Sequence, residues 1–356
     1  MLDISTQIDQ LFKRYSEAIL GFTLCIVCNK KSTSTLSDEM SSEYLSNSEF
    51  EEVVSMFSSL DMDMEFFLNE DDFMKFILND KSLRKFVVYN AAQSGKGAGR
   101  KSLIPSFCNL HRIPVTGSNA HVVSLCRHKY HTNKLLSAGG FPVPDSWLYA
   151  NGIQDSDVPH KNQKIILKPL YESSSIGIDD DSVIFFNHDH RTQEIIIRKQ
   201  ESLDQPIMLQ QFIEGYEAEI PVLSYMGKVI CFAPVGISLS DDPLMGDSIL
   251  NYESVYFDQY HFYSFELVSK ACKEMIEIAK RVSFYLGIEG LGRIDFRICR
   301  NGKFYITDVS TNPHFVRHSS IYHAFQKIGM QDNDIARAIV CGALSKTSTY
   351  YASDQN

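Results

Sequence analysis

Long apolar runs are missing from this chain. No stretch of its 356 residues approaches the roughly 20 apolar residues that a membrane-spanning helix requires. The N-terminal stretch MLDISTQIDQLFKRYSEAILGF carries acids and has no continuous apolar core, so it does not resemble a signal peptide. We therefore expect a cytoplasmic protein without membrane contact. Its length predicts two or three domains with a substantial core.

Clustered cysteines are missing as well. The eight cysteines are scattered, and only Cys25 and Cys28 form a CxxC pair, within the apolar run FTLCIVC. Such a run predicts a buried strand. We expect reduced thiols in the core, and neither a disulfide framework nor a redox pair.

Acidic residues are absent from Lys81 to Pro144, a segment that contains ten lysines and arginines. The whole chain has a net charge of −10, so this basic segment belongs to an acidic protein. That asymmetry indicates a cleft for anions. Nucleic acid is the alternative, but the segment lacks interleaved aromatic residues, which favours small phosphates or carboxylates.

The N-terminal third alternates between the two kinds of secondary structure. A helix over 1–18 precedes a strand at 22–28, and helices at 48–59 and 70–79 alternate with strands at 64–67 and 86–89. This order is typical of an open α/β unit. Further along, Ser118 or Asn119 could cap a helix that runs to about Ala138.

Residues 291–310, LGRIDFRICRNGKFYITDVS, predict a β-hairpin with a two-residue type I′ turn at Asn301-Gly302. In that register Asp295 lies opposite Asp308. Like charges that face each other are destabilising unless something compensates. A divalent cation would do so, because Mg²⁺ takes one or two carboxylates together with substrate phosphates. The alternatives are a solvated face neutralised by neighbouring arginines, or a bulge that breaks the register.

Two loops complete the pattern of candidate binding elements. The strand KIILKP places Lys168 at its end, and the loop YESSSIGI that follows offers hydroxyl and backbone N–H groups to an anion. The polar stretch 239–261 predicts a covering loop.

In this order and spacing, residues 86–342 resemble the ATP-grasp superfamily, and specifically its D-alanine–D-alanine ligase-like branch. The stretch IPVTGSNAHVVSLCRHKYHTNKLLSAGGFPVPDSW resembles the branch's entry into its central domain, and GRIDFRI with DVSTNP resembles its metal hairpin. The resemblance implies an α/β plus α+β ATP-grasp fold, with an N-terminal open α/β substrate domain (1–117), a central subdomain (118–205) and a C-terminal subdomain with the hairpin (206–356). It also implies a homodimer.

The resemblance implies the role of each site residue. Residues that contact ATP are Lys129, Lys168, Ser173, Ser174, Ser175, Gln210, Gln211, Phe212, Ile213 and Glu217. Residues that bind Mg²⁺, with Mn²⁺ as an alternative, are Asp295, Asp308 and Ser310. Residues with a catalytic role are Arg293, Ser174 and Tyr256, and those that hold the carboxylate of the attacking substrate are Ser319 and Ser320.

Several positions depart from the pattern of the branch. Ser310 stands where a metal-binding asparagine is expected, and Asn312 comes two residues late. His314 replaces a glycine, and Val255 replaces a lysine of the covering loop. The acid-free segment offers no carboxylate to the ammonium group of a first amino acid. A first substrate without that ammonium would instead suit Arg100 or Lys101.

These observations predict an ATP-dependent ligase that phosphorylates a small acid or an enol or carbonyl metabolite and joins it to the amine of an amino acid. Mycosporine-glycine, which is anionic and has no primary amine, is the specific candidate. A D-alanine–D-alanine ligase or another dipeptide ligase is the alternative, followed by an ATP-grasp kinase and a non-catalytic nucleotide-binding protein.

Overall fold

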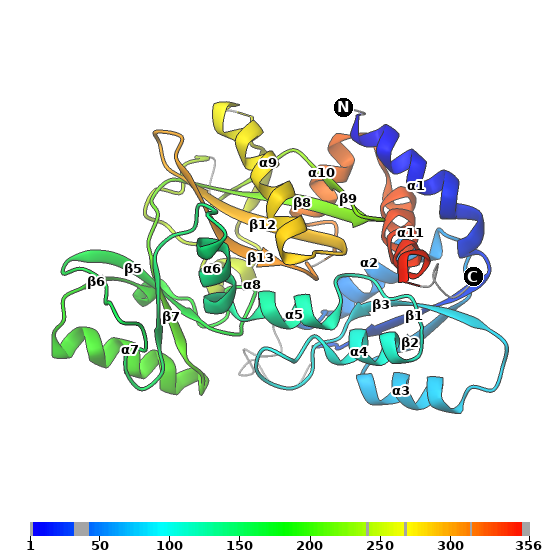
Figure 1. Ribbon diagram of the computed structural model, residues 1–356, viewed down its shortest axis with the longest axis horizontal. Coiled ribbons are helices and arrows are strands. Elements are labelled where there is room, and N and C mark those ends of the chain that lie inside the picture. The colour runs from blue at the N-terminus through cyan, green and yellow to red at the C-terminus, as the bar shows by residue number, and fades with distance from the viewer. Residues whose placement is uncertain (1–2, 32–42, 240–241, 267–268, 314, 351–356) are drawn as a thin grey trace.

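The computed structural model describes residues 3–31, 43–239, 242–266, 269–313 and 315–350 (Figure 1). The helices are α1 (Ile4–Ile19), α2 (Asn47–Ser58), α3 (Glu70–Asn79), α4 (Leu103–Leu110), α5 (Ala120–Arg127), α6 (Lys129–Ala138), η2 (Asp180–Ser182), α7 (His190–Leu203), α8 (Tyr252–Tyr256), α9 (Ser269–Leu286), α10 (Ser320–Lys327) and α11 (Asp332–Tyr350). The strands are β1 (Phe22–Cys28), β2 (Met64–Phe67), β3 (Lys85–Ala91), β4 (Ser146–Tyr149), β5 (Gln163–Pro169), β6 (Val183–Phe186), β7 (Ile207–Gln211), β8 (Tyr216–Tyr225), β9 (Lys228–Cys231), β10 (Val235–Ser238), β11 (His261–Ser264), β12 (Gly290–Ile298) and β13 (Phe304–Ser310).

The N-terminal part is an open α/β unit, as predicted. Its parallel sheet has the order β2-β1-β3, and the run FTLCIVC forms the buried central strand. Cys25 and Cys28 are both free and buried. Helix α2 begins at a capping box in which Ser46 and Glu49 exchange hydrogen bonds, which fixes where the preceding chain enters the helix.

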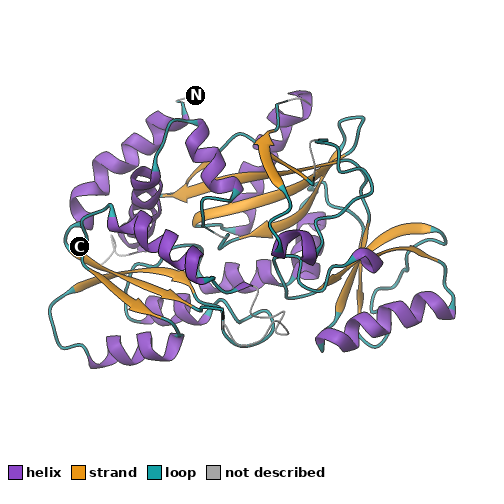
Figure 2. Cartoon of the chain, turned by 180° about the vertical axis from the view of Figure 1, so that it is seen from behind, coloured by secondary structure: helices purple, strands orange, loops and turns teal. Residues whose placement is uncertain are grey.

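Two antiparallel sheets follow, a small one with the order β4-β7-β5-β6 and a larger one with the order β11-β10-β8-β12-β13. Seen from behind, the small sheet and α7 lie at one end of the molecule, and the larger sheet lies between them and the N-terminal sheet (Figure 2). The predicted boundary at 205/206 falls before β7, yet this strand pairs with β4 and β5 of the small sheet.

One apolar core joins the two ends of the chain. Buried side chains of α1, β1, β8 and α11 pack in a single cluster that includes Ile8, Leu24, Leu223 and Ile339. The N-terminal sheet is thereby packed against the larger sheet. Among the described residues, no helix is long and apolar enough to span a membrane.

The predicted hairpin is present, but its turn differs from the prediction. Three residues, Arg300, Asn301 and Gly302, connect Cys299 to Lys303, with Gly302 at a φ of 85°. A type I turn followed by a left-handed glycine forms such a loop, so the two-residue type I′ turn is wrong. The longer loop shifts the register by one residue.

A bulge at Thr307 then restores the predicted register. Phe296 faces Ile306, whereas Asp295 faces Asp308, so Thr307 has no partner across the ladder. The turn and the bulge offset each other, and the two aspartates meet as predicted. The predicted helix from Asn119 to Ala138 also differs, because it breaks into α5 and α6 at His128.

Candidate active site

A cavity of about 850 Å³ lies between the two antiparallel sheets and extends to the N-terminal part of the chain. Strands β5 and β7 line it from the small sheet, and β8, β12 and β13 line it from the larger sheet. All the residues that the resemblance assigned to ATP, metal and catalysis lie on its walls, although they come from distant parts of the chain. Of the residues expected to contact a substrate, Lys101, Ser319 and Ser320 also line the cavity, whereas Arg100 does not.

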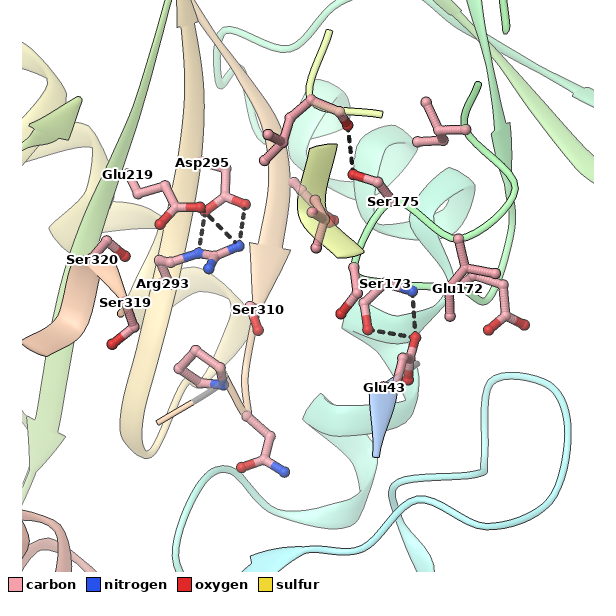
Figure 3. A pocket seen from close by; sticks show the side chains of 18 of the residues that line it. Glu43, Glu172, Ser173, Ser175, Glu219, Arg293, Asp295, Ser310, Ser319 and Ser320 are labelled. Carbon is pink, nitrogen blue, oxygen red and sulfur yellow. Dashed lines mark hydrogen bonds and ion pairs between the residues drawn. The ribbon is translucent and has the colours of Figure 1, made fainter. Parts of the chain in front are cut away.

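Three carboxylates form a row on the face of the larger sheet that lines the cavity. Asp308 lies opposite Asp295, and Asp295 lies opposite Glu219 on β8. Arg293 neutralises part of this charge: it binds Asp295 through two hydrogen bonds of 2.7 and 2.8 Å and lies 3.1 Å from Glu219 (Figure 3). The arginine is therefore held in a fixed orientation by two acids.

Glu219 was not identified from the sequence, although it lies two residues after Glu217 on the same side of a strand. Its side chain is almost fully buried, and its Oε2 atom makes no hydrogen bond with the described residues. Burial raises the pKa of Glu219 to about 8, against the opposing effect of Arg293. Ser320 lies beside it (Figure 3).

Two lysines face the free end of the acidic row. Lys129 Nζ lies 2.9 Å from Asp308 Oδ2, and Lys168 donates to the carbonyl oxygen of the bulged Thr307 at 3.3 Å. Burial lowers the pKa of Lys168 to about 8. Burial opposes ionisation of Asp308 too, but Lys129 and Lys168 lower its pKa to about 2. The lysines and Asp308 therefore form one electrostatic unit.

The serine-rich loop is fixed at both of its ends. Ser173 donates its backbone and hydroxyl protons to Glu43, and Ser175 donates to the carbonyl oxygen of Leu250 in the covering segment at 2.6 Å. Ser174 and Ser175 have φ values of 52° and 55°, which is a left-handed conformation that costs energy for serine. Ser174 lines the cavity between these two anchors.

The end of the cavity beside the last residues of β7 is suited to a flat ring with polar edges. Gln210, Gln211, Phe212 and Ile213 line it where β7 ends. Phe212 packs between Lys164 and Arg297, at 4.9 and 5.6 Å from its ring. Glu217 also lines this end and lies 2.9 Å from Arg297.

The remaining predicted residues, Ser319, Ser320 and Tyr256, also line the cavity. Ser319 caps α10 with its hydroxyl, and Ser320 has a buried hydroxyl without a hydrogen bond to any described residue. Tyr256 lines the cavity from the covering segment and is 45% exposed. His314 lies outside the described residues.

A second group of buried charges closes the cavity on the N-terminal side. Glu43, Arg100, Arg127 and Glu172 are joined by ion pairs, the shortest being 2.7 Å between Arg127 and Glu43. Lys101 lines the cavity beside them. The acid-free segment suggested that carboxylates would be lacking here. Instead Glu43 and Glu172 enter from the chain on either side of that segment, a placement that no local pattern in the sequence indicates.

The geometry fits a divalent cation that is shared with a phosphate ligand. Asp295 and Asp308 face each other on the cavity wall, and carboxylate oxygens are suitable ligands for Mg²⁺. Within the described ranges, no three His, Cys, Asp or Glu side chains gather as a metal site. The protein would then supply two carboxylates, and phosphate oxygens would supply further ligands.

Ser310 lies opposite Arg293 at the end of the same hairpin, whereas the amide nitrogen of Asn312 donates a 3.0 Å hydrogen bond to the carbonyl oxygen of Asn90 in the N-terminal sheet. We therefore expect Ser310→Asn to preserve or improve Mg²⁺ affinity, because an amide oxygen is a better ligand than a hydroxyl. Titration of nucleotide-dependent turnover with Mg²⁺ would measure this. A complete loss of turnover would instead mean that Ser310 contacts another group.

Comparison with known proteins identifies what this site is similar to. Residues 154–341 match the family model described as the D-Ala D-Ala ligase C-terminus. The D-alanine–D-alanine ligase of Bordetella pertussis is 27% identical over 237 residues, which cover 66% of this chain and 71% of that protein. Ligase B of Pseudomonas putida is 26% identical over 241 residues, covering 65% and 69% respectively.

Solved structures agree on the fold. The D-alanine–D-alanine ligase of Bacillus anthracis complexed with ATP aligns with a TM-score of 0.67 at 15% identity, covering 92% of this chain and 99% of that one. The VanG D-Ala:D-Ser ligase of Enterococcus faecalis aligns with a TM-score of 0.64 at 16% identity, covering 91% and 99%. These neighbours confirm the predicted ATP-grasp architecture.

Proposed function

The chain belongs to the D-alanine–D-alanine ligase family of ATP-grasp enzymes, and we propose that it activates the acid group of a small metabolite with ATP and joins it to the amine of an amino acid. It is an ATP-dependent, ADP-forming carbon–nitrogen ligase. The observation that carries the proposal is the set of Lys129, Lys168 and Arg293 around the facing Asp295 and Asp308 in one cavity.

The proposed reaction has two steps. A carboxylate oxygen of the first substrate attacks the γ-phosphorus of ATP, the bond from that phosphorus to ADP breaks, and an acyl phosphate and ADP are formed. The amine nitrogen of the second substrate then attacks the carbonyl carbon, phosphate leaves, and the nitrogen loses a proton. The net reaction converts the acid, the amine and ATP into the amide, ADP and phosphate.

The described side chains support both steps. Lys129 and Lys168 stabilise the charge that shifts during phosphoryl transfer, and Mg²⁺ bound by Asp295 and Asp308 would neutralise the phosphate oxygens. Gln211, Phe212 and Glu217 hold the adenosine end. Arg293, which two acids hold in place, faces the oxyanion that forms when the amine attacks.

Two loops supply further side chains to the site, namely Ser174, Ser175 and Tyr256. The anchored loop offers Ser174 to the phosphate and the first substrate, and Tyr256 covers them from the segment that Ser175 holds. Ser319 and Ser320 would place the attacking amino acid near Arg293, since both line the cavity on that side.

Two substrate assignments remain as candidates. The named relatives favour D-alanyl-D-alanine formation or another dipeptide synthesis. The buried cations around Lys101 favour a first substrate that is anionic and lacks a free amine, such as mycosporine-glycine activated at its enol oxygen. The enol candidate forms an enol phosphate in place of the acyl phosphate.

A screen of ADP release tests the proposal directly. The purified protein is given ATP, Mg²⁺ and pairs of one acid with one L- or D-amino acid, and products are identified by mass spectrometry. Efficient D-alanyl-D-alanine formation would select the dipeptide candidate. ADP release without any coupled product would indicate a kinase, and no ADP release with any pair would contradict the ligase proposal.

Lys129→Ala and Lys168→Ala should each weaken ATP binding by about 10-fold to 100-fold, because each removes a charge-assisted contact to phosphate. Calorimetry with a non-hydrolysable ATP analogue measures the affinity. Lys134→Ala is the matched control, since Lys134 lies on the same helix as Lys129 and also pairs with an aspartate at 2.9 Å, but outside the cavity. Unchanged affinity in both site variants would contradict the placement of ATP.

A further inference from the structure

We propose that the N-terminal end of the cavity is a subsite for an anionic group of the first substrate, held by Lys101 and Arg127, and that this substrate has no ammonium group there. The inference rests on the proposed function, because it names the substrate class of the same cavity. The simplest members of that class are dicarboxylates: one acid group is activated, and the other binds in the subsite.

The protein already supplies hydrogen-bond partners to both carboxylates of this cluster. Glu43 accepts hydrogen bonds from Arg127 on both oxygens, at 2.7 and 2.8 Å, and from the backbone and hydroxyl of Ser173. Burial opposes its ionisation, but Lys101 and the two arginines lower the pKa of Glu43 well below its ordinary range. Glu43 is therefore a charged acceptor whose partners are supplied by the protein.

Glu172 also has a partner on each of its oxygens. Its Oε2 atom accepts from Arg100 at 3.0 Å, and its Oε1 atom accepts from Gln205 at 3.0 Å. An ammonium group that entered this end would therefore meet three cations and two acids that are already paired. New contacts would not offset the free-energy cost of removing water from the ammonium group.

The cations, in contrast, are incompletely satisfied. Lys101 makes no hydrogen bond or ion pair with a residue that the structure describes, although it lines the cavity beside Arg127. Burial, followed by the nearby charge of Arg127, lowers the pKa of Lys101 to about 7. The Nε atom of Arg127 is buried and also has no hydrogen-bond partner among the described residues. An anion in the cavity is the ligand that would pair with Lys101, next to the positive charge of Arg127.

Arg100 does not line this subsite but binds Glu172 beside it. Its Nε atom donates to the carbonyl oxygen of Gln93 at 2.8 Å, and its side chain is fully buried. The prediction that Arg100 itself contacts substrate is therefore replaced by Arg127, which reaches the cavity and also donates to Ser173 at 2.8 Å. Figure 3 shows Glu43 against Ser173, across the cavity from Arg293. A substrate between these walls would touch the serine-rich loop and the reacting centre together.

The test uses glutarate as the probe, with D-alanine and acetate as comparisons. Calorimetry measures their binding to the full chain in the presence of ADP and Mg²⁺. We expect the wild type to bind glutarate more tightly than either comparison, and Lys101→Met to weaken glutarate binding by about 10-fold to 100-fold. Lys101→Met removes the charge while keeping an unbranched side chain, and it leaves the pairs of Glu43 intact.

Lys96→Met is the matched control, because Lys96 lies on the same loop with its side chain 80% exposed. It should leave glutarate binding unchanged. Tighter binding of D-alanine than of glutarate, or equal binding of glutarate by wild type and Lys101→Met, would overturn the inference. A Lys101→Met defect confined to ATP affinity would also overturn it, since the subsite would then hold a nucleotide phosphate.

ATP affinity and ADP release separate this inference from the proposed function. Glutarate binding that depends on Lys101, in a protein that never releases ADP, would support the subsite and contradict the ligase. Ligase activity together with glutarate binding that is independent of Lys101 would support the ligase and contradict the subsite.

Discussion

Asp308→Asn should reduce turnover by at least about 100-fold to 1,000-fold, the scale on which a single electrostatic contact to a transition state acts. Asp308 faces Asp295 on the cavity wall, and it is the member of the pair that binds Lys129. Asparagine keeps the shape of the side chain but removes the charge that Lys129 pairs with and that a divalent cation would use. Steady-state ADP release at saturating Mg²⁺ measures the loss.

The variant should remain folded. Lys129 and Lys168 lower the pKa of Asp308 to about 2, so its carboxylate stabilises the fold above the ordinary pKa of 3.8 and that contribution disappears as the pH falls through 2. The variant lacks this contribution at neutral pH, so we expect a modest fall in thermal unfolding temperature. Asp155→Asn is the control, since it also loses a lysine pair at 2.9 Å, outside the cavity. Wild-type turnover of Asp308→Asn would refute the metal assignment.

For the hairpin, the sequence pattern predicts the buried face but not the turn type or the bulge. The apolar alternation of Ile294, Phe296 and Ile298 in the sequence indicates a buried face, and all three side chains are buried in the structure, because burial of one face determines a strand's orientation. The turn type could not be derived, since Asn-Gly also fits a longer loop that ends in a left-handed glycine. Asp295 and Asp308 still meet because the bulge at Thr307 compensates, and bulges have no reliable sequence signal.

The charge cluster at the N-terminal end shows what patterns miss. An acid-free segment was visible in the sequence, and it does supply Arg100, Lys101 and Arg127. Their partners Glu43 and Glu172 lie outside it and reach the cluster only through tertiary packing. Local composition therefore predicted the cations, but not the acids that neutralise two of them. Their role in binding an anionic ligand stays a prediction.

Helix α7 is a simpler case of the same limit. The sequence is ambiguous there, because three consecutive isoleucines, 195–197, favour a strand, whereas the flanking residues favour a helix. The structure has a helix there, capped by Asp189, with Ile196 buried against the small sheet and Ile197 exposed. Packing against the sheet overrides the strand propensity of β-branched residues.

Arg293→Lys should also nearly abolish turnover, with a loss of about 100-fold to 1,000-fold in the chemical step. Arg293 binds Asp295 through two parallel hydrogen bonds and contacts Glu219 with the same guanidinium. A lysine keeps one charge but cannot reproduce this fork, so the cation would no longer be fixed toward the reacting centre. Removal of the charge itself would leave two buried acids unpaired, which typically costs about 3–5 kcal/mol of stability. Lysine is therefore the informative substitution.

The test separates catalysis from folding and from binding. Arg84→Lys is the control, because Arg84 also contacts two carboxylates, Glu65 at 3.0 Å and Asp80 at 3.6 Å, far from the cavity wall. We expect Arg84→Lys to retain wild-type turnover, and Arg293→Lys to lose kcat while its affinity for ATP changes little. A raised KM for ATP with unchanged kcat would assign Arg293 to nucleotide binding instead. Because Glu219 and Asp295 fix the guanidinium before any substrate arrives, the catalytic effect that we propose for it would require no reorganisation during the reaction, and that preorganisation is what lysine cannot supply.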